Sequence, residues 1–152
     1  PPALLLDLAI YGFSLGSTIA IDLAVSNPPK ALVTEAALAS AQGFLDDALG
    51  LGFSSSVLMN ARFDNIGKIP SVISAKLISH GMLDDFVTFE FATLLYDAAH
   101  DPKELYPVSE AGHGNVPCPT TRDTELSTEI EPCVAEDDWL ERIGDFLDEN
   151  LP

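Results

Sequence analysis

The sequence predicts an α/β fold in which helices flank a parallel sheet of about four strands. The clearest observation is the order of residue types from 8 to 25: a short apolar run, a turn bounded by glycines, and a run of helix-compatible residues. The second observation is that 30–34 is apolar enough to be buried on both faces, as strands of parallel sheets are. The third is that two further apolar strands, at 75–79 and 104–108, each run into a polar motif.

The first predicted strand runs from Asp7 to Ser14, and a helix continues from there to about Ser26. Between them stands a Gly-x-Ser-x-Gly sequence at 12–16. A strand, a sharp turn and a helix are the context of a nucleophile elbow, which presents a serine hydroxyl at the carboxyl end of a sheet. We expect strained backbone at Ser14, and we expect Gly12 and Gly16 to let the strand and the helix approach closely.

Helices are expected after each strand. The first should place Ile19, Ala20 and Leu23 against the sheet. A second is expected over 36–49, and a third should begin at Phe86 or Thr88 and end at Ala99. The last is expected over 137–150, where four apolar side chains share the face that docks on the sheet: Trp139, Ile143, Phe146 and Leu147.

Two polar motifs follow the later strands. His-Gly-Met-Leu-Asp-Asp occupies 80–85, and Glu-Ala-Gly-His-Gly-Asn occupies 110–115. The chain order is therefore serine, acid, histidine, each at the carboxyl end of a predicted strand. This order is used by α/β-hydrolases and differs from the orders of chymotrypsin-like and subtilisin-like enzymes.

The three motifs, at 11–16, 80–84 and 112–114, resemble the active-site motifs of the α/β-hydrolase superfamily. The segments at 62–66 and 95–106 are similar to those of a branch of α/β-hydrolase-domain proteins that includes protein depalmitoylases. In the superfamily the nucleophile turn follows the fifth strand. The resemblance therefore implies that the chain corresponds to the carboxyl-terminal half of the fold, and that a missing amino-terminal half is one of its partners.

The resemblance and the residue types together predict a serine hydrolase that cleaves carboxylic esters or thioesters through an acyl-enzyme. Ser14 would be the nucleophile, His113 its base, and Asp84 the acid that orients the imidazole. The backbone N–H of Leu15 would be one oxyanion donor. Two alternatives stay open, a non-catalytic binding domain of the same fold and a serine peptidase.

Some of these assignments have alternatives. The His-Gly-x-x-Asp spacing selects Asp84, with Asp85 as its alternative, and either carboxylate could instead be solvated or cap a helix. Carboxylates at 46 and 47 are remoter candidates for the acid, and His113 could be a surface loop histidine. His80 is expected to hold its own turn through local hydrogen bonds.

Apolar side chains near the site are candidates for binding an acyl group. We select Phe13, Phe44 and Leu58 for this role. Simple packing in the domain is the competing interpretation of each.

The length of 152 residues fits a single domain, 1–152, with one insertion at 116–134 that is acidic and rich in proline and threonine. Cys118 and Cys133 bracket the insertion. Two thiols without histidine partners fall short of a zinc site, so we predict a disulfide, which favours an extracytoplasmic location. Two free thiols in a cytosolic protein is the alternative.

The net charge of −17 argues against two classes of partner. With 7 basic and 24 acidic residues, the chain is unsuited to nucleic acid and to anionic lipid surfaces. No apolar run approaches the ~18 residues of a membrane span. We expect an acylated or small-molecule substrate, and no cofactor or metal.

Overall fold

The computed structural model describes residues 5–40, 63–114 and 136–151. The elements in chain order are β1 (Leu6–Phe13), α1 (Leu15–Ser26), β2 (Pro29–Glu35), α3 (Asn65–Lys68), the 3₁₀ helix η2 (Ile69–Ser71), β3 (Ala75–Gly81), α4 (Glu90–Ala98), β4 (Lys103–Val108) and α5 (Glu136–Asn150). The four strands form one sheet in the order β1-β2-β3-β4, and all three neighbouring pairs are parallel. The predicted fold class is confirmed.

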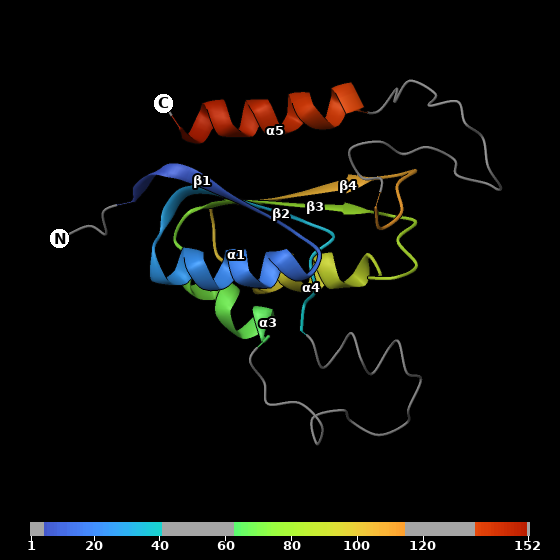
Figure 1. The fold of residues 1–152 in the computed structure, drawn as a ribbon, viewed down its shortest axis with the longest axis horizontal. Helices are drawn as coiled ribbons and strands as arrows, with labels where there is room; N and C mark the ends of the chain where they lie inside the picture. The colour runs from blue at the N-terminus through green and yellow to red at the C-terminus, as the bar shows by residue number, and fades with distance from the viewer. Residues whose placement is uncertain (1–4, 41–62, 115–135, 152) are drawn as a thin grey trace, which may run out of the picture.

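The sheet is the middle of three layers. In Figure 1, α5 lies above the sheet, and α1, α3 and α4 lie below it. Strands β2 and β3 are central and almost wholly buried, which explains the apolar residues at their centres, 31–33 in β2 and 77–78 in β3. Because every strand is parallel, the loops that follow β1, β2, β3 and β4 meet at one edge of the sheet.

Each face of the sheet carries its own core. Below the sheet, the buried side chains of Ile21, Leu32, Ile78 and Leu95 belong to one cluster. On the opposite face, Phe146 of α5 is 1% exposed and packs on Ala31, Val33 and Leu77. Burying a side chain of this size stabilises a fold by roughly 1.5–3 kcal/mol. The docking of α5 through its apolar face is as predicted.

Of the three residues of α1 predicted to lie against the sheet, Ala20 is buried, and the prediction was wrong for Ile19 and Leu23. Ile19 and Leu23 are 67% and 45% exposed, whereas five other residues of the helix are buried, namely Ser17, Thr18, Ala20, Ile21 and Ala24. The helix is apolar around most of its circumference, so its sequence does not select one face. The structure selects the face with smaller side chains because the helix and β1 are in close contact at Gly12.

Two other helix boundaries differ from expectation. Helix α4 begins at Glu90, because residues 84–87 form a turn around the Asp84 carboxylate. The segment 36–40 is not helical, and Ala36 has φ 47°. The rest of the helix expected over 36–49 lies outside the described residues, as do the insertion at 116–134 and both cysteines.

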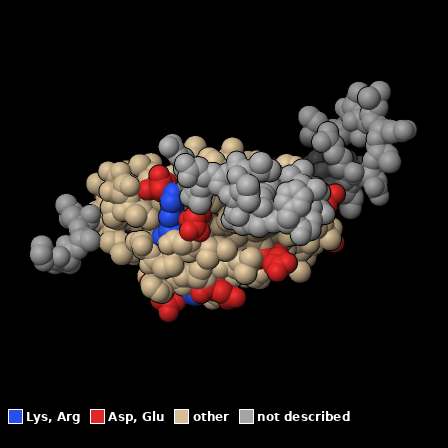
Figure 2. All heavy atoms as spheres, turned by 90° about the horizontal axis from the view of Figure 1, so that it is seen from below, with Lys and Arg blue, Asp and Glu red and all other residues tan. Residues whose placement is uncertain are grey.

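Two further features concern the charged surface and the helices. Acidic side chains stand among a larger uncharged surface on the face shown in Figure 2, where few basic ones are visible. In the described part of the chain, no helix combines the length and the apolar character needed to cross a membrane.

Candidate active site

Ser14 lies at the turn between β1 and α1, at the carboxyl edge of the sheet. Its φ is 51° and its ψ is −124°, a conformation that side chains rarely adopt. The turn is held from β2, since the Ser14 N–H donates to the carbonyl of Glu35 at 2.8 Å. The Ser17 hydroxyl also donates to the carbonyl of Gly12 at 2.8 Å. These bonds hold the backbone of the turn that carries Ser14.

The two glycines of the turn are not equivalent. A Cβ atom on Gly12 would lie 2.7 Å from both the Cβ of Ala20 and the Cα of Ser17, so any side chain there would push α1 away from β1. A Cβ on Gly16 would meet none of the described residues within 4 Å. The expected close approach therefore requires Gly12, whereas the expectation for Gly16 was wrong, because α1 and β1 are not in close contact at that residue.

The structure brings three of the predicted side chains into one chain of hydrogen bonds. Ser14 Oγ lies 2.9 Å from His113 Nε2, and His113 Nδ1 lies 2.8 Å from Asp84 Oδ2. The Asp84 side chain is fully buried, and that of His113 is 21% exposed. A substrate can therefore reach the imidazole, while water cannot reach the carboxylate that orients it.

Asp84 is surrounded by donors. Its Oδ1 accepts from the backbone N–H groups of Phe86 at 3.0 Å and Val87 at 2.8 Å, and its Oδ2 lies 3.2 Å from His80 Nε2 as well as beside His113. Burial alone would raise the pKa of Asp84, but these hydrogen bonds outweigh burial and hold the pKa below its ordinary value. The alternative acid, Asp85, is exposed to solvent.

His80 is buried and keeps its hydrogen bonds within its own loop, as expected. Its Nε2 lies 2.7 Å from the carbonyl oxygen of Val87. A carbonyl only accepts, so the proton is on Nε2, and Nδ1 is buried with no hydrogen-bond partner in the described part of the chain. His80 therefore connects the Asp84 carboxylate to the backbone that follows it.

The loops that carry Asp84 and His113 are joined by backbone hydrogen bonds. The Met82 N–H donates to the carbonyl of Val108, and the Leu83 N–H donates to that of Ala111, both at 2.9 Å. Gly81 makes this approach possible, because a Cβ there would lie 2.3 Å from the carbonyl oxygen of Ala111. The separation of acid and histidine is thus set by the backbone.

Two aromatic rings flank His113. The ring centroid of Phe13 lies 5.3 Å from that of the imidazole, and the centroid of Phe86 lies 4.9 Å from it. Both phenylalanines are exposed, at 39% and 58%, so they form an apolar rim beside Ser14. Phe13 was predicted to lie near substrate, and Phe86 was missed. The other two candidates, Phe44 and Leu58, lie outside the described residues, as do the carboxylates at 46 and 47.

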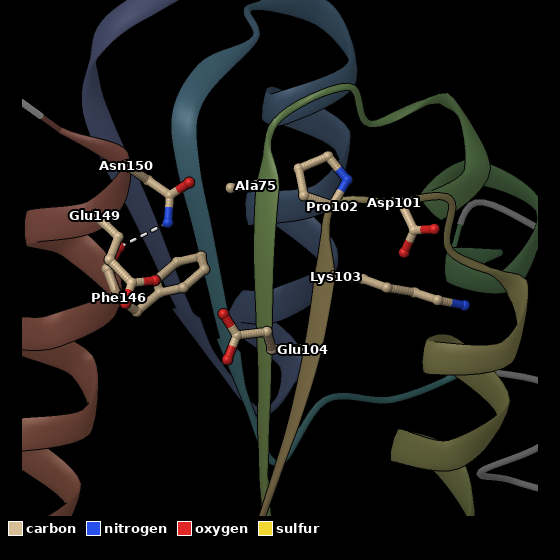
Figure 3. A pocket seen from close by; sticks show the side chains of 8 residues that line it. All are labelled: Ala75, Asp101, Pro102, Lys103, Glu104, Phe146, Glu149 and Asn150. Carbon is tan, nitrogen blue, oxygen red and sulfur yellow. Dashed lines mark hydrogen bonds between the residues drawn. The ribbon is translucent and has the colours of Figure 1, made fainter.

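A separate cavity lies at the opposite end of the sheet. It measures about 390 Å³ and is lined by the first residues of β3 and β4 and the last turns of α5, including Ala75, Lys103 and Glu149 (Figure 3). The amino ends of the strands border it, whereas Ser14 is at their carboxyl ends, so this cavity is remote from the hydrogen-bonded chain. Within the described ranges, no group of three or more His, Cys, Asp or Glu side chains is arranged to hold a metal ion.

Known proteins resemble the chain in both sequence and structure. The human alpha/beta hydrolase domain-containing protein 17B is 30% identical over 112 residues, which cover 72% of this chain. The crystal structure of the esterase domain of a Rhodothermus marinus protein superposes on 95% of this chain and 61% of its own, with a TM-score of 0.67 and 18% identity. The chain belongs to the α/β-hydrolase superfamily.

Another solved structure shares the fold at lower coverage of its own length. The acylaminoacyl peptidase of Pyrococcus horikoshii matches 94% of this chain and 24% of its own, with a TM-score of 0.66 and 17% identity. The chain spans 36% of the length of the human relative. No protein-family model matches the sequence.

Proposed function

We propose that the protein is a serine hydrolase that cleaves carboxylic esters or thioesters through an acyl-enzyme on Ser14. The observation that supports this most is the continuous chain from Ser14 Oγ to His113 to Asp84, at 2.9 and 2.8 Å. Such a chain makes a neutral imidazole the proton acceptor of a serine hydroxyl, which is otherwise a weak nucleophile.

The chemistry follows from the hydrogen bonds. Asp84 accepts a hydrogen bond from His113 Nδ1–H, which keeps the proton on Nδ1 and leaves Nε2 free to take the Ser14 proton as Oγ attacks the acyl carbon. The imidazolium then gives that proton to the departing alkoxide or thiolate. A water molecule then attacks the acyl carbon while His113 takes its proton. The bond between the acyl carbon and Ser14 Oγ breaks, the imidazolium gives its proton to Oγ, and the acid is released.

The Leu15 N–H is proposed to stabilise the oxyanion of each tetrahedral intermediate. Leu15 is the first residue of α1, so its N–H lacks an intrahelical acceptor and lies at the positive end of the helix. Losing one such donor typically slows acyl transfer by about 10²–10³.

The apolar rim supports an acyl group as the part of the substrate beside Ser14. Phe13 and Phe86 expose large ring surfaces next to the imidazole, and such surfaces are suited to a hydrocarbon chain.

Labelling with a serine-directed fluorophosphonate, together with turnover of p-nitrophenyl acetate, tests the proposal. Both activities should be present in the parent protein and absent from Ser14→Ala. Equal labelling of Ser14→Ala would contradict the role of Ser14. Labelling without hydrolysis of any ester, thioester or acyl-amino-acid amide would favour a non-catalytic domain, and hydrolysis of the amide alone would favour a peptidase.

We also infer that β1 pairs with a further strand, from the amino-terminal half that the family resemblance implies. The first strand is at the edge of the described sheet, and three of its apolar side chains, Leu6, Leu8 and Tyr11, are 41–53% exposed. An open apolar edge promotes association. Sedimentation of the 152-residue chain should show self-association that Leu8→Lys reduces, and a monomeric parent chain would contradict the inference.

A further inference from the structure

Glu35 is a buried carboxylate that the proposed reaction does not use. It is the last residue of β2 and is 2% exposed. Its neighbours across the sheet are Phe13 of β1 and Ser79 of β3, so it lies directly beside the strand that leads into Ser14. Burying a charge costs stability unless partners compensate it, so this glutamate requires an explanation.

The side chain of Glu35 belongs to a small polar cluster. The Tyr11 hydroxyl donates to Glu35 Oε2. The Tyr11 ring lies edge-on to the ring of Trp139 on α5, with centroids 6.4 Å apart, and Trp139 Nε1–H donates to Ser79 Oγ at 3.2 Å. The cluster of Tyr11, Glu35, Ser79 and Trp139 thus joins three neighbouring strands to α5.

The charges that act on Glu35 come from the candidate active site. Burial raises the pKa of its carboxyl above 4.5, while the hydrogen bond from Tyr11 and the charged forms of His113 and His80 act in the opposite direction. Tyr11 stays a donor, because burial and the bond to Glu35 raise the pKa of its phenol. Geometry places Glu35 close to the imidazole that forms a cation in the reaction, because Glu35 pairs across the sheet with Phe13, whose ring centroid lies 5.3 Å from that of His113. A negative charge on Glu35 attracts a positive charge that forms there.

We propose that Glu35 is a positioning residue of the active site, whose buried carboxylate stabilises the imidazolium formed on His113 when Ser14 loses its proton. Asp84 contacts the imidazole directly at Nδ1, whereas Glu35 acts on it through space from β2. Glu35 does not contact the substrate. This inference rests on the proposed function, because it assigns His113 the role of general base.

The substitution Glu35→Gln tests the charge alone. Glutamine keeps the shape of the side chain and an oxygen that accepts from Tyr11, and the backbone carbonyl that holds Ser14 is unaffected. The matched control is Glu149→Gln, which removes the same charge from an exposed residue at the far cavity (Figure 3).

In Glu35→Gln we expect kcat for p-nitrophenyl acetate to fall about tenfold, the size of effect that a partly screened charge has on a nearby ion, with KM unchanged. The acid limb of the kcat/KM profile should move to lower pH. The midpoint of the His113 imidazole titration, followed by NMR, should move in the same direction. Glu149→Gln should leave all of these measurements at their parent values.

Stability separates this role from a structural one. The raised pKa of Glu35 means that its favourable contribution to folding is full below pH 4.5 and is lost as pH rises through the folded-state pKa. At a pH above the folded-state pKa of Glu35, the free energy of unfolding of Glu35→Gln should therefore equal or exceed that of the parent. A less stable variant with an unchanged His113 titration would make Glu35 structural and overturn the proposal.

Two further outcomes are decisive. An unchanged kcat together with an unchanged His113 titration in Glu35→Gln would also overturn the proposal. If that variant does not fold, Tyr11→Phe replaces it: loss of the donor should move the His113 titration the same way by less, and no movement would overturn the proposal. A parent protein without ester hydrolysis would refute the proposed function, while the NMR titration would still test the coupling.

Discussion

The substitution Asp84→Asn gives a sharp prediction because the structure fixes how the new amide must lie. The two backbone N–H groups of Phe86 and Val87 both donate to Oδ1, at 3.0 and 2.8 Å. The oxygen of the introduced amide must take that position, because an NH₂ group would face two donors. The NH₂ group is then directed at His113 Nδ1 and at His80 Nε2.

This orientation reverses the proton on His113. An imidazole that accepts at Nδ1 carries its proton on Nε2, where it can no longer accept the Ser14 hydroxyl proton. In a serine protease, the same Asp-to-Asn change in the triad lowers kcat by about 10⁴ through loss of the required tautomer. This loss corresponds to an increase of about 5.4 kcal/mol in the activation free energy. Because the Asp84 side chain is fully buried, water cannot restore the missing acceptor.

Steady-state hydrolysis of p-nitrophenyl acetate by Asp84→Asn measures the effect, and thermal unfolding checks that the variant is folded. The control is Asp85→Asn, an exposed neighbour that should retain the parent kcat. A folded Asp84→Asn variant that keeps more than about a tenth of the parent kcat would refute the reasoning. Its kcat would then have fallen less than about tenfold, whereas a fall of about 10⁴ is expected. A large loss in Asp85→Asn with none in Asp84→Asn would move the acid to Asp85.

The remaining predictions concern other parts of the chain. Gly81→Ala should destabilise the fold and slow hydrolysis, because its Cβ would lie 2.3 Å from the Ala111 carbonyl oxygen and push the loops that carry Asp84 and His113 apart. Chemical denaturation measures the first effect and kcat the second, and parent values in both would contradict the assigned contact. The lowered pKa of Asp84 contributes stability above pH 3.8 that is lost as pH falls through its folded-state pKa. In that range the free energy of unfolding of the parent should drop more steeply with pH than that of Asp84→Asn. Parallel curves of unfolding free energy against pH would argue against the hydrogen bonds assigned to the carboxylate. Thiol titration of the unfolded, unreduced chain should find no free thiol if Cys118 and Cys133 form the predicted disulfide, whose loop would contribute roughly 3 kcal/mol; two titratable thiols would remove it.

Much of the fold could be predicted because its strands are short, apolar and separated by clear breaks. The motif around Ser14 requires a strand before it and a helix after it, and β1 and α1 supply them. The buried strands β2 and β3 are recognisable from the short apolar runs at their centres. The predictions for Ile19 and Leu23 of α1 failed because an evenly apolar helix gives no periodic signal for one face. The start of α4 and the segment 36–40 also differ from the prediction.

The predicted Ser14, Asp84 and His113 meet in the structure because all three follow the carboxyl ends of parallel strands, which lie at one edge. Phe86 and Glu35 were missed for different reasons. The turn around Asp84 turns the Phe86 ring toward His113, where a helix had been expected. Glu35 had a weak signal, a lone carboxylate directly after an apolar strand, but its contact with Tyr11 depends on strand register.

The most direct test of the central claim is to trap the acyl-enzyme. The parent protein is mixed with p-nitrophenyl acetate, quenched in acid within the first turnover and digested for mass spectrometry. One acetyl group should appear on the peptide that contains Ser14, with release of one equivalent of p-nitrophenol, and Asp84→Asn should form it far more slowly. Hydrolysis that proceeds with Ser14 unmodified, or with the acetyl group on another residue, would contradict nucleophilic attack by Ser14.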